Sequence, residues 1–274
     1  MTPRLTALIA CLALALVACS ASAAPLTASV SGASSSANAG GLTIYGAASL
    51  KGALDKAKTA YETANPGTIL TISTDSSAAL ETQIEQGAPA DVFLSADTTN
   101  PKKLVDKGLA DGSAVNFAGN KLTIIVPSAN PAGIETPADL ARTGIKVIAA
   151  GDEVPITKYA TQLVANLSME AGYPATFVAA YTANIASRED NVKAVVAKVE
   201  LGEGDAGIVY VTDAKASTKV TTVEVPDSAN VPATYDGVVI KASKNTAAAR
   251  ALLDWFVGPD GQAILSTYGF LPPS

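Results

Sequence analysis

The sequence predicts an α/β protein, in which strands and helices alternate from Leu42 to the C-terminus. Short runs rich in β-branched and aromatic residues alternate there with segments of helical periodicity. The runs are almost continuously apolar, which favours strands covered by helices on both faces over the alternation of a half-exposed sheet. The chain has 274 residues, a length that allows one large or two modest domains with a well-buried core.

Eight runs are predicted to be strands, and five segments between them are predicted to be helices. The helices begin their apolar stripes at Leu50, Leu80, Ile156, Val192 and Ala249. The strands are expected at 42–47, 68–74, 91–96, 121–127, 145–150, 206–211, 221–226 and 236–242. The apolar stripes pack each helix on a sheet, so we expect the binding groups at the helix starts.

Small polar residues stand at those starts. Ser49 precedes the first helix, Ser76 and Ser77 the second, and residues 187–191 the fourth. Such residues are ordinary N-caps. A helix start with small neighbours also offers free N–H groups and a partial positive charge, so several starts that converge would form an anion site without any lysine or arginine.

The N-terminus carries an export signal. Arg4 precedes an apolar run that is too short to span a bilayer. The run ends in "LVAC", which resembles the lipobox of bacterial lipoproteins and predicts a signal peptide at 1–18 and lipidation at Cys19. An ordinary secretory cleavage near "ASAA" remains the alternative. Residues 19–41, rich in Ser, Ala and Gly, are expected to form a flexible tether from the membrane.

The composition excludes several classes of function. The formal net charge is −6, with no basic stripe for nucleic acid. The chain has no histidine, and both of its cysteines, Cys11 and Cys19, precede the predicted folded part. The commonest general base, the usual zinc ligands and every Ser-His or Cys-His pair are therefore missing, and no disulfide is expected.

Two segments carry a family resemblance. "YGAASLKGAL" and "TDSSAALETQIEQGAPADVFLSAD" resemble the corresponding blocks of periplasmic molybdate-binding proteins, the ModA type, which serve ABC importers. "GNKLTIIVP", "GDEVPITKYA", "REDNVKAVVAKVELGEGDAGIVYVTDA" and "GPDGQAILSTYGF" follow in the family's order and spacing. The resemblance covers essentially all of residues 42–274.

The resemblance implies a type II periplasmic binding protein fold, with two α/β lobes joined by two crossing strands and a ligand cleft between them. Lobe one would comprise 42–118 plus 233–274, and lobe two 119–232. The C-terminal segment would thus return to the lobe in which the chain begins.

The resemblance also implies which residues bind the oxyanion. Ser49 would give its hydroxyl and backbone N–H, and Ser77 would give its hydroxyl, with Ser76 as the alternative. Ile156 and Val192 would each give a backbone N–H, and Tyr210 its phenol hydroxyl. Molybdate near neutral pH is a dianion without a proton to donate, so every ligand atom must be a donor, and hydroxyls and amides meet that demand.

Three positions depart from the family's pattern. Asp75 stands where a small residue is common, and its carboxylate would repel a dianion unless it points away or caps the helix. Ala78 replaces a third hydroxyl found in some relatives. Ile156-Thr157 replaces an Ala-Gly pair and leaves more bulk near the site.

The resemblance therefore predicts a monomeric, lipid-anchored, extracytoplasmic binding protein that is not an enzyme and has no cofactor. It would capture molybdate, or tungstate, through the oxyanion and not through a separate metal site, and would deliver it to an ABC permease. The two ions have almost the same size and charge, so the choice between them stays open.

Four alternatives remain. The ligand could be sulfate or phosphate, and Asp75 could accept the proton that phosphate often keeps. An iron-binding protein of this fold would use paired tyrosines with carboxylates, whereas only Tyr210 stands at a motif position. An enzyme could use Ser49 or Ser77 as a nucleophile with Lys51 or Lys158, although no nucleophile-elbow or S-x-x-K pattern supports it. A purely structural surface lipoprotein would not need the cleft motifs.

Overall fold

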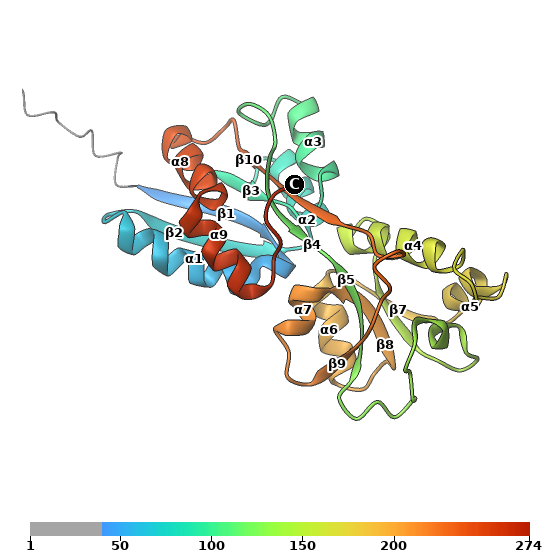
Figure 1. The fold of residues 1–274 in the computed structure, drawn as a ribbon. Coiled ribbons are helices and arrows are strands. Elements are labelled where there is room, and N and C mark those ends of the chain that lie inside the picture. The colour runs from blue at the N-terminus through green and yellow to red at the C-terminus, as the bar shows by residue number, and fades with distance from the viewer. Residues whose placement is uncertain (1–39) are drawn as a thin grey trace, which may run out of the picture. The chain divides into compact units, whose positions relative to one another are not determined.

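Two five-stranded sheets organise the chain in the computed structural model, which describes residues 40–274 (Figure 1). The signal peptide at 1–18, Cys19 and almost all of the tether at 19–41 lie outside the described residues. None of the helices within 40–274 is long and apolar enough to cross a membrane.

The first sheet has the order β2-β1-β3-β10-β4. β1, β2 and β3 run parallel, whereas β10 is antiparallel to both β3 and β4. The register places Tyr45 opposite Ser73 and Gly237 opposite Leu94. The strands are β1 Gly41–Ala47, β2 Ile69–Asp75, β3 Val92–Leu94, β4 Val115–Asn120 and β10 Ala233–Val239.

The second sheet has the order β7-β6-β8-β5-β9. β6 runs parallel to β7 and β8, and β5 is antiparallel to β8 and β9. This is the arrangement of the first sheet repeated, with three parallel strands followed by one antiparallel strand. The strands are β5 Leu122–Pro127, β6 Val147–Ala150, β7 Ile185–Glu189, β8 Ala206–Tyr210 and β9 Val220–Val223.

Helices accompany each sheet. The helices that accompany the first sheet are η1 Ala48–Leu50, α1 Lys51–Ala64, α2 Ser77–Glu85, α3 Thr99–Asp106, α8 Thr246–Val257 and α9 Pro259–Tyr268. The helices that accompany the second sheet are η2 Pro137–Ala141, α4 Pro155–Leu167, α5 Phe177–Ala183, α6 Val192–Glu200 and α7 Val211–Lys215. Their apolar stripes are buried, as Leu54 and Ala57 of α1 and Val195 and Val199 of α6 illustrate.

The chain passes between the sheets twice. It leaves the first sheet after Asn120, and β5 begins at Leu122; it returns after β9, with β10 starting at Ala233. The lobe limits expected from the sequence stay a prediction, and the strands place Gly119 and Asn120 in the first sheet.

All eight expected strands and all five expected helices are present within a few residues of their predicted positions. β4 and β7 and helices α3, α5, α7 and α9 were not expected. β7 ends in Arg188 and Glu189 and alternates between half-buried and exposed positions, so it lacks the apolar run that marks a central strand. The expectation of cover on both faces is right for β3 and β8 and wrong for the edge strand β2, which is partly exposed.

Candidate functional site

One small pocket brings together all six residues predicted to bind an anion. It is lined from the first sheet's side by Ser49, Ser76 and Ser77, and from the second sheet's side by Ile156, Val192 and Tyr210. The centre of a water-sized sphere can move within about 10 Å³ of it, which is the room that one water molecule needs. Small residues, among them Ala47, Ala48 and Ala96, complete the lining.

The small residues at the end of β1 and directly after it have two different causes. A Cβ at Gly46 would collide with the Leu54 side chain, so close packing of α1 on β1 demands glycine there. Ala47 and Ala48 instead line the pocket, where larger side chains would fill it. Ser49 lies in the single turn η1 that joins β1 to α1, and only 6% of it is exposed.

A chain of hydrogen bonds orients the Ser49 hydroxyl. The Asn120 side-chain oxygen accepts the backbone N–H of Lys121 at 3.0 Å, which assigns the amide nitrogen as the donor to the Thr212 hydroxyl at 2.9 Å and the Tyr235 hydroxyl at 3.3 Å. The Tyr235 and Ser49 hydroxyls lie 2.9 Å apart. If Tyr235 donates to Ser49, the Ser49 O–H stays free for the pocket.

Ser77 is prepared in a similar way. It is the first residue of α2, and its Oγ accepts the backbone N–H of Ala96 at 3.0 Å. The Ser77 O–H is thereby left to donate into the pocket. Ser76 also lines the pocket and is the N-cap of α2, where its Oγ accepts the Ala79 N–H at 3.2 Å.

The second sheet's side offers backbone N–H groups. Ile156 and Val192 lie in the first turns of α4 and α6, where backbone N–H groups have no partner within the helix. Asn191 caps α6 by accepting the Ala194 N–H at 3.1 Å. Both side chains are buried in the core, so the groups that these residues can offer a polar ligand are their amides, which carry the partial positive charge of the helix ends.

Tyr210 contributes a buried hydroxyl without a partner. It ends β8, only 2% of it is exposed, and its hydroxyl makes no hydrogen bond within residues 40–274. Burial, and next the neighbouring Tyr235 and Tyr159, raise the pKa of Tyr210 well above its ordinary value, so the phenol stays protonated. An unpaired buried hydroxyl costs about 1–3 kcal/mol, and an acceptor in the pocket would recover that cost.

Asp75 does not line this pocket. Its Oδ1 accepts the Ser76 N–H at 2.7 Å and the Asn191 side-chain N–H at 3.1 Å. The carboxylate thus links the end of β2 to the cap of α6 and faces a neighbouring groove. Of the two possibilities raised for this position, the side chain pointing away from the site is the one found. No group of three or more metal-ligating side chains occurs in the described part of the chain.

Two residues that support the site had no sequence signal of their own. Asn120 is in a strand that the sequence did not predict, and Tyr235 is indistinguishable from a core tyrosine. The Ser49–Tyr235 contact joins positions 186 residues apart. Asn191 stood among the helix-start residues, but its bond to Asp75 spans 116 residues.

The repeated sheet topology, with two polypeptide crossings and a pocket of converging donors from both halves, defines a type II periplasmic binding protein. Comparison with known proteins agrees. Residues 42–271 match the family model described as bacterial extracellular solute-binding protein. The chain belongs to this family, and it is therefore an extracytoplasmic solute-binding protein.

Individual relatives and a solved structure show more specific similarity. The Molybdate-binding protein ModA of Mycobacterium bovis is 34% identical to this chain over 85% of each chain. A putative ABC transporter substrate-binding lipoprotein, YvgL of Bacillus subtilis, is 30% identical over 84% of this chain and 85% of its own. The solved periplasmic molybdate-binding protein of Azotobacter vinelandii superposes with a TM-score of 0.72 at 27% identity, covering 85% of this chain and 100% of that one.

Proposed function

We propose that the protein captures molybdate or tungstate outside the cytoplasm and delivers it to an ABC permease. The observation that carries the proposal is the composition of the pocket. Ser49, Ser77 and Tyr210 bring three hydroxyls to the pocket, and Ile156 and Val192 bring two helix-start amides. A compact, fully deprotonated oxyanion would accept from all of them. The names of the relatives supply the identity of the metal.

Phosphate fits this donor set less well. Near neutral pH it often keeps a proton, which needs an acceptor inside the site. Asp75, the acceptor considered from the sequence, does not line the pocket, and its Oδ1 already accepts from Ser76 and Asn191. Sulfate has no such proton and differs from molybdate in size, so titration has to separate those two.

The direct test is calorimetry on the exported chain with four anions: molybdate, tungstate, sulfate and phosphate. We expect binding of molybdate and tungstate with micromolar or lower Kd, and weaker binding of sulfate and phosphate. A thermal shift should accompany binding, because ligand at about one hundred times Kd adds about 2.7 kcal/mol to stability. No heat and no shift with molybdate or tungstate would overturn the proposal.

We also propose that the site is not catalytic. Lys51 and Lys158 were the candidate bases for a serine nucleophile. Lys51 Nζ pairs with Asp55 at 2.9 Å on the exposed face of α1, and Lys158 Nζ bonds to the Thr99 hydroxyl at 3.2 Å. Ser49 instead faces the phenol of Tyr235, a group that is not a base at neutral pH. Turnover of ester or phosphoester substrates that is lost in Ser49→Ala would contradict this proposal.

We further propose that the protein is anchored through a lipid on Cys19 and that it is a monomer. Lipid attached to Cys19 would hold the protein at the membrane, and residues 19–41 would give it reach. Cys19→Ser should move the chain from the membrane fraction to the soluble fraction of expressing cells. Retention of the variant in membranes would argue against the anchor, and gel filtration of the lipid-free chain tests for a monomer.

A further inference from the structure

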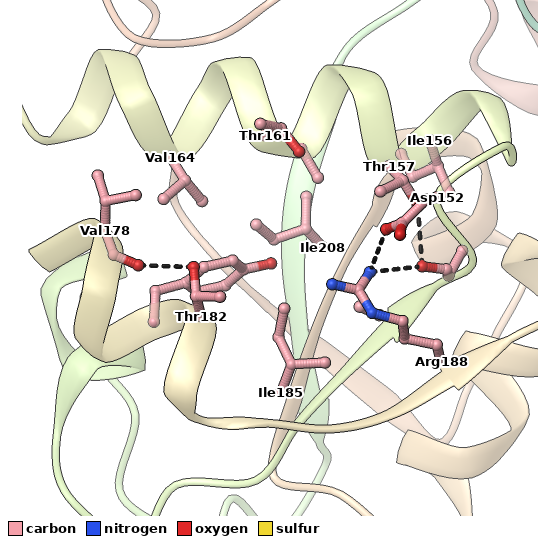
Figure 2. A pocket seen from close by; sticks show the side chains of 14 residues that line it. Asp152, Ile156, Thr157, Thr161, Val164, Val178, Thr182, Ile185, Arg188 and Ile208 are labelled. Carbon is pink, nitrogen blue, oxygen red and sulfur yellow. Dashed lines mark hydrogen bonds and ion pairs between the residues drawn. The ribbon is translucent and has the colours of Figure 1, made fainter.

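A second and larger cavity lies in the half of the protein built on the second sheet (Figure 2). It occupies about 240 Å³ between α4, α5 and strands β6, β7 and β8. A cavity of about 150 Å³ is enough to bind benzene. The small pocket lined by Ser49, Ser77 and Tyr210 is called the anion pocket below. Ile156 lines both that pocket and this cavity, so the two spaces adjoin each other.

The walls of this cavity are mainly apolar. Figure 2 shows Val164 on α4, Val178 on α5, and Ile185 and Ile208 around the same space. The threonine hydroxyls of Thr157 and Thr182 are already used, because Thr157 bonds to the carbonyls of Ala150 and Gly151 and Thr182 bonds to that of Val178. An occupant would therefore present an apolar body to these walls.

Arg188 forms a charged end of the cavity. One guanidinium nitrogen, Nη1, lies 2.8 Å from Asp152 and donates to the Ala150 carbonyl at 3.3 Å. No other hydrogen bond of this guanidinium occurs within residues 40–274, and Figure 2 shows a second nitrogen turned toward Ile185 and Ile208. The Asp152 side chain is 78% exposed, and exposed pairs contribute only about 0–1 kcal/mol. Arg188 thus has free donors on the cavity side.

Tyr181 adds a neutral donor near that charge. Only 7% of the residue is exposed, it lines the cavity, and its hydroxyl makes no hydrogen bond within the described chain. Burial raises its pKa to about 12 although the positive charge of Arg188 acts in the opposite direction. The hydroxyl is therefore protonated and has no acceptor within the described chain, in a cavity whose charged end is also a donor.

We propose that this cavity binds a small organic carboxylate, with an aromatic or branched apolar body between α4 and α5. Its carboxylate accepts from the free N–H groups of Arg188 and from the Tyr181 hydroxyl. A planar guanidinium suits a carboxylate because it can donate two parallel hydrogen bonds. Asp152 also lines the cavity and competes for the same guanidinium. This site is independent of the anion pocket and of the proposed transport function.

Benzoate and benzyl alcohol are the matched probes, because they share a ring and differ in charge. Titration of the exported chain, followed by calorimetry and ligand-detected NMR, should show benzoate binding at least tenfold more tightly than benzyl alcohol. Equal affinity for the two probes, or no binding of benzoate, would overturn the proposal. Saturating molybdate should leave benzoate binding in place. Displacement of benzoate by molybdate would show that benzoate binds in the anion pocket and would contradict the proposal.

Four variants locate the site. Arg188→Gln should weaken benzoate binding at least tenfold, and Tyr181→Phe severalfold, whereas Asp152→Asn should strengthen it by freeing the guanidinium. Arg142→Gln is the matched control, since Arg142 is 45% exposed, close to the 42% of Arg188, and bonds to loop carbonyls away from the cavity. Thermal melts of each variant check folding. Unchanged benzoate affinity in both Arg188→Gln and Tyr181→Phe would refute the assignment.

Discussion

The two sides of the anion pocket supply donors in different ways. On the first sheet's side, Ser77 Oγ accepts the Ala96 N–H, and the Ser49 and Tyr235 hydroxyls lie 2.9 Å apart, with either able to donate. On the second sheet's side, Tyr210 has no partner and the other donors are backbone amides. The two serine hydroxyls therefore have partners in the ligand-free protein, whereas the Tyr210 hydroxyl has none in the described structure.

Because of this difference, substitutions on the two sides should affect ligand affinity and ligand-free stability differently. Removing a donor whose oxygen is already bonded breaks a contact in the ligand-free protein, so it should cost both affinity and stability. Removing a donor without a partner takes away an unpaired polar group, so it should cost affinity while the ligand-free protein gains or keeps its stability.

The largest effect is expected for Ser49→Ala. It removes a hydrogen bond to a charged ligand, which contributes about 1.5–3 kcal/mol, or roughly a tenfold to 150-fold loss of molybdate affinity. It also removes the buried hydrogen bond between the Ser49 and Tyr235 hydroxyls, so the ligand-free melting temperature should fall by several degrees. Calorimetry and thermal melts measure the two effects. An unchanged melting temperature with lost affinity would show that Tyr235 does not hold Ser49.

Tyr210→Phe should come next, with the opposite effect on stability. Affinity should fall about tenfold to thirtyfold, since one donor to the anion is lost. The ligand-free protein should melt at the same or a higher temperature, because the hydroxyl that disappears had no hydrogen bond in the described structure. A clear drop in melting temperature would mean that Tyr210 has a structural partner and would remove the contrast between the two sides.

Tyr235→Phe tests the chain of hydrogen bonds behind Ser49. Tyr235 does not line the pocket, so its loss should reduce affinity only about threefold to tenfold, through a less ordered Ser49 hydroxyl. Residues that act through one another give non-additive effects. In a Ser49→Ala background, Tyr235→Phe should therefore leave affinity unchanged. Additive losses would show that Tyr235 acts on the ligand by another route.

Residues in local motifs could be predicted from the sequence, whereas residues that act through long-range contacts could not. Ser49, Ser77 and Tyr210 stand in recognisable motifs, and the structure brings them together in one pocket. Their roles as ligands stay a prediction until binding is measured. Tyr235 and Asn120 were not predicted, because the hydrogen bonds between them and to Ser49 span 115 and 186 positions, and no local pattern encodes such a contact.

The fold shows a similar division. Strands such as β5 and β8 are buried along most of their length and were predicted from their apolar runs. β4, with the sequence "VNFAGN", was not predicted, because its polar side chains are satisfied by tertiary contacts: Asn116 bonds to the Tyr235 carbonyl at 3.0 Å. Propensity and periodicity describe local preference, and these strands depend on partners far along the chain.

Asp75→Asn should have a smaller effect, of opposite sign. The amide oxygen can still accept from Ser76 and Asn191, while the negative charge near the dianion disappears. Molybdate affinity should rise about twofold to threefold at low salt and less at high salt, since salt screens partly exposed charges. Asp75→Ala, which removes the acceptor as well, is the comparison. A decrease with asparagine as large as that with alanine would show that the charge itself holds the two sides together.

The smallest effect is expected from pH. The chain has no histidine, and the raised pKa of Tyr210, caused first by its burial, keeps the phenol protonated above the range in which a free tyrosine ionises. Ionisation would remove a donor and place a negative charge beside the anion, so affinity falls only above that pKa. Between pH of about 6.5 and about 9.5, molybdate affinity should therefore change less than about twofold. A loss of affinity with a midpoint near pH 8 would mean that the second side does not rely on a buried, neutral Tyr210, and the contrast between the two sides would then need another donor.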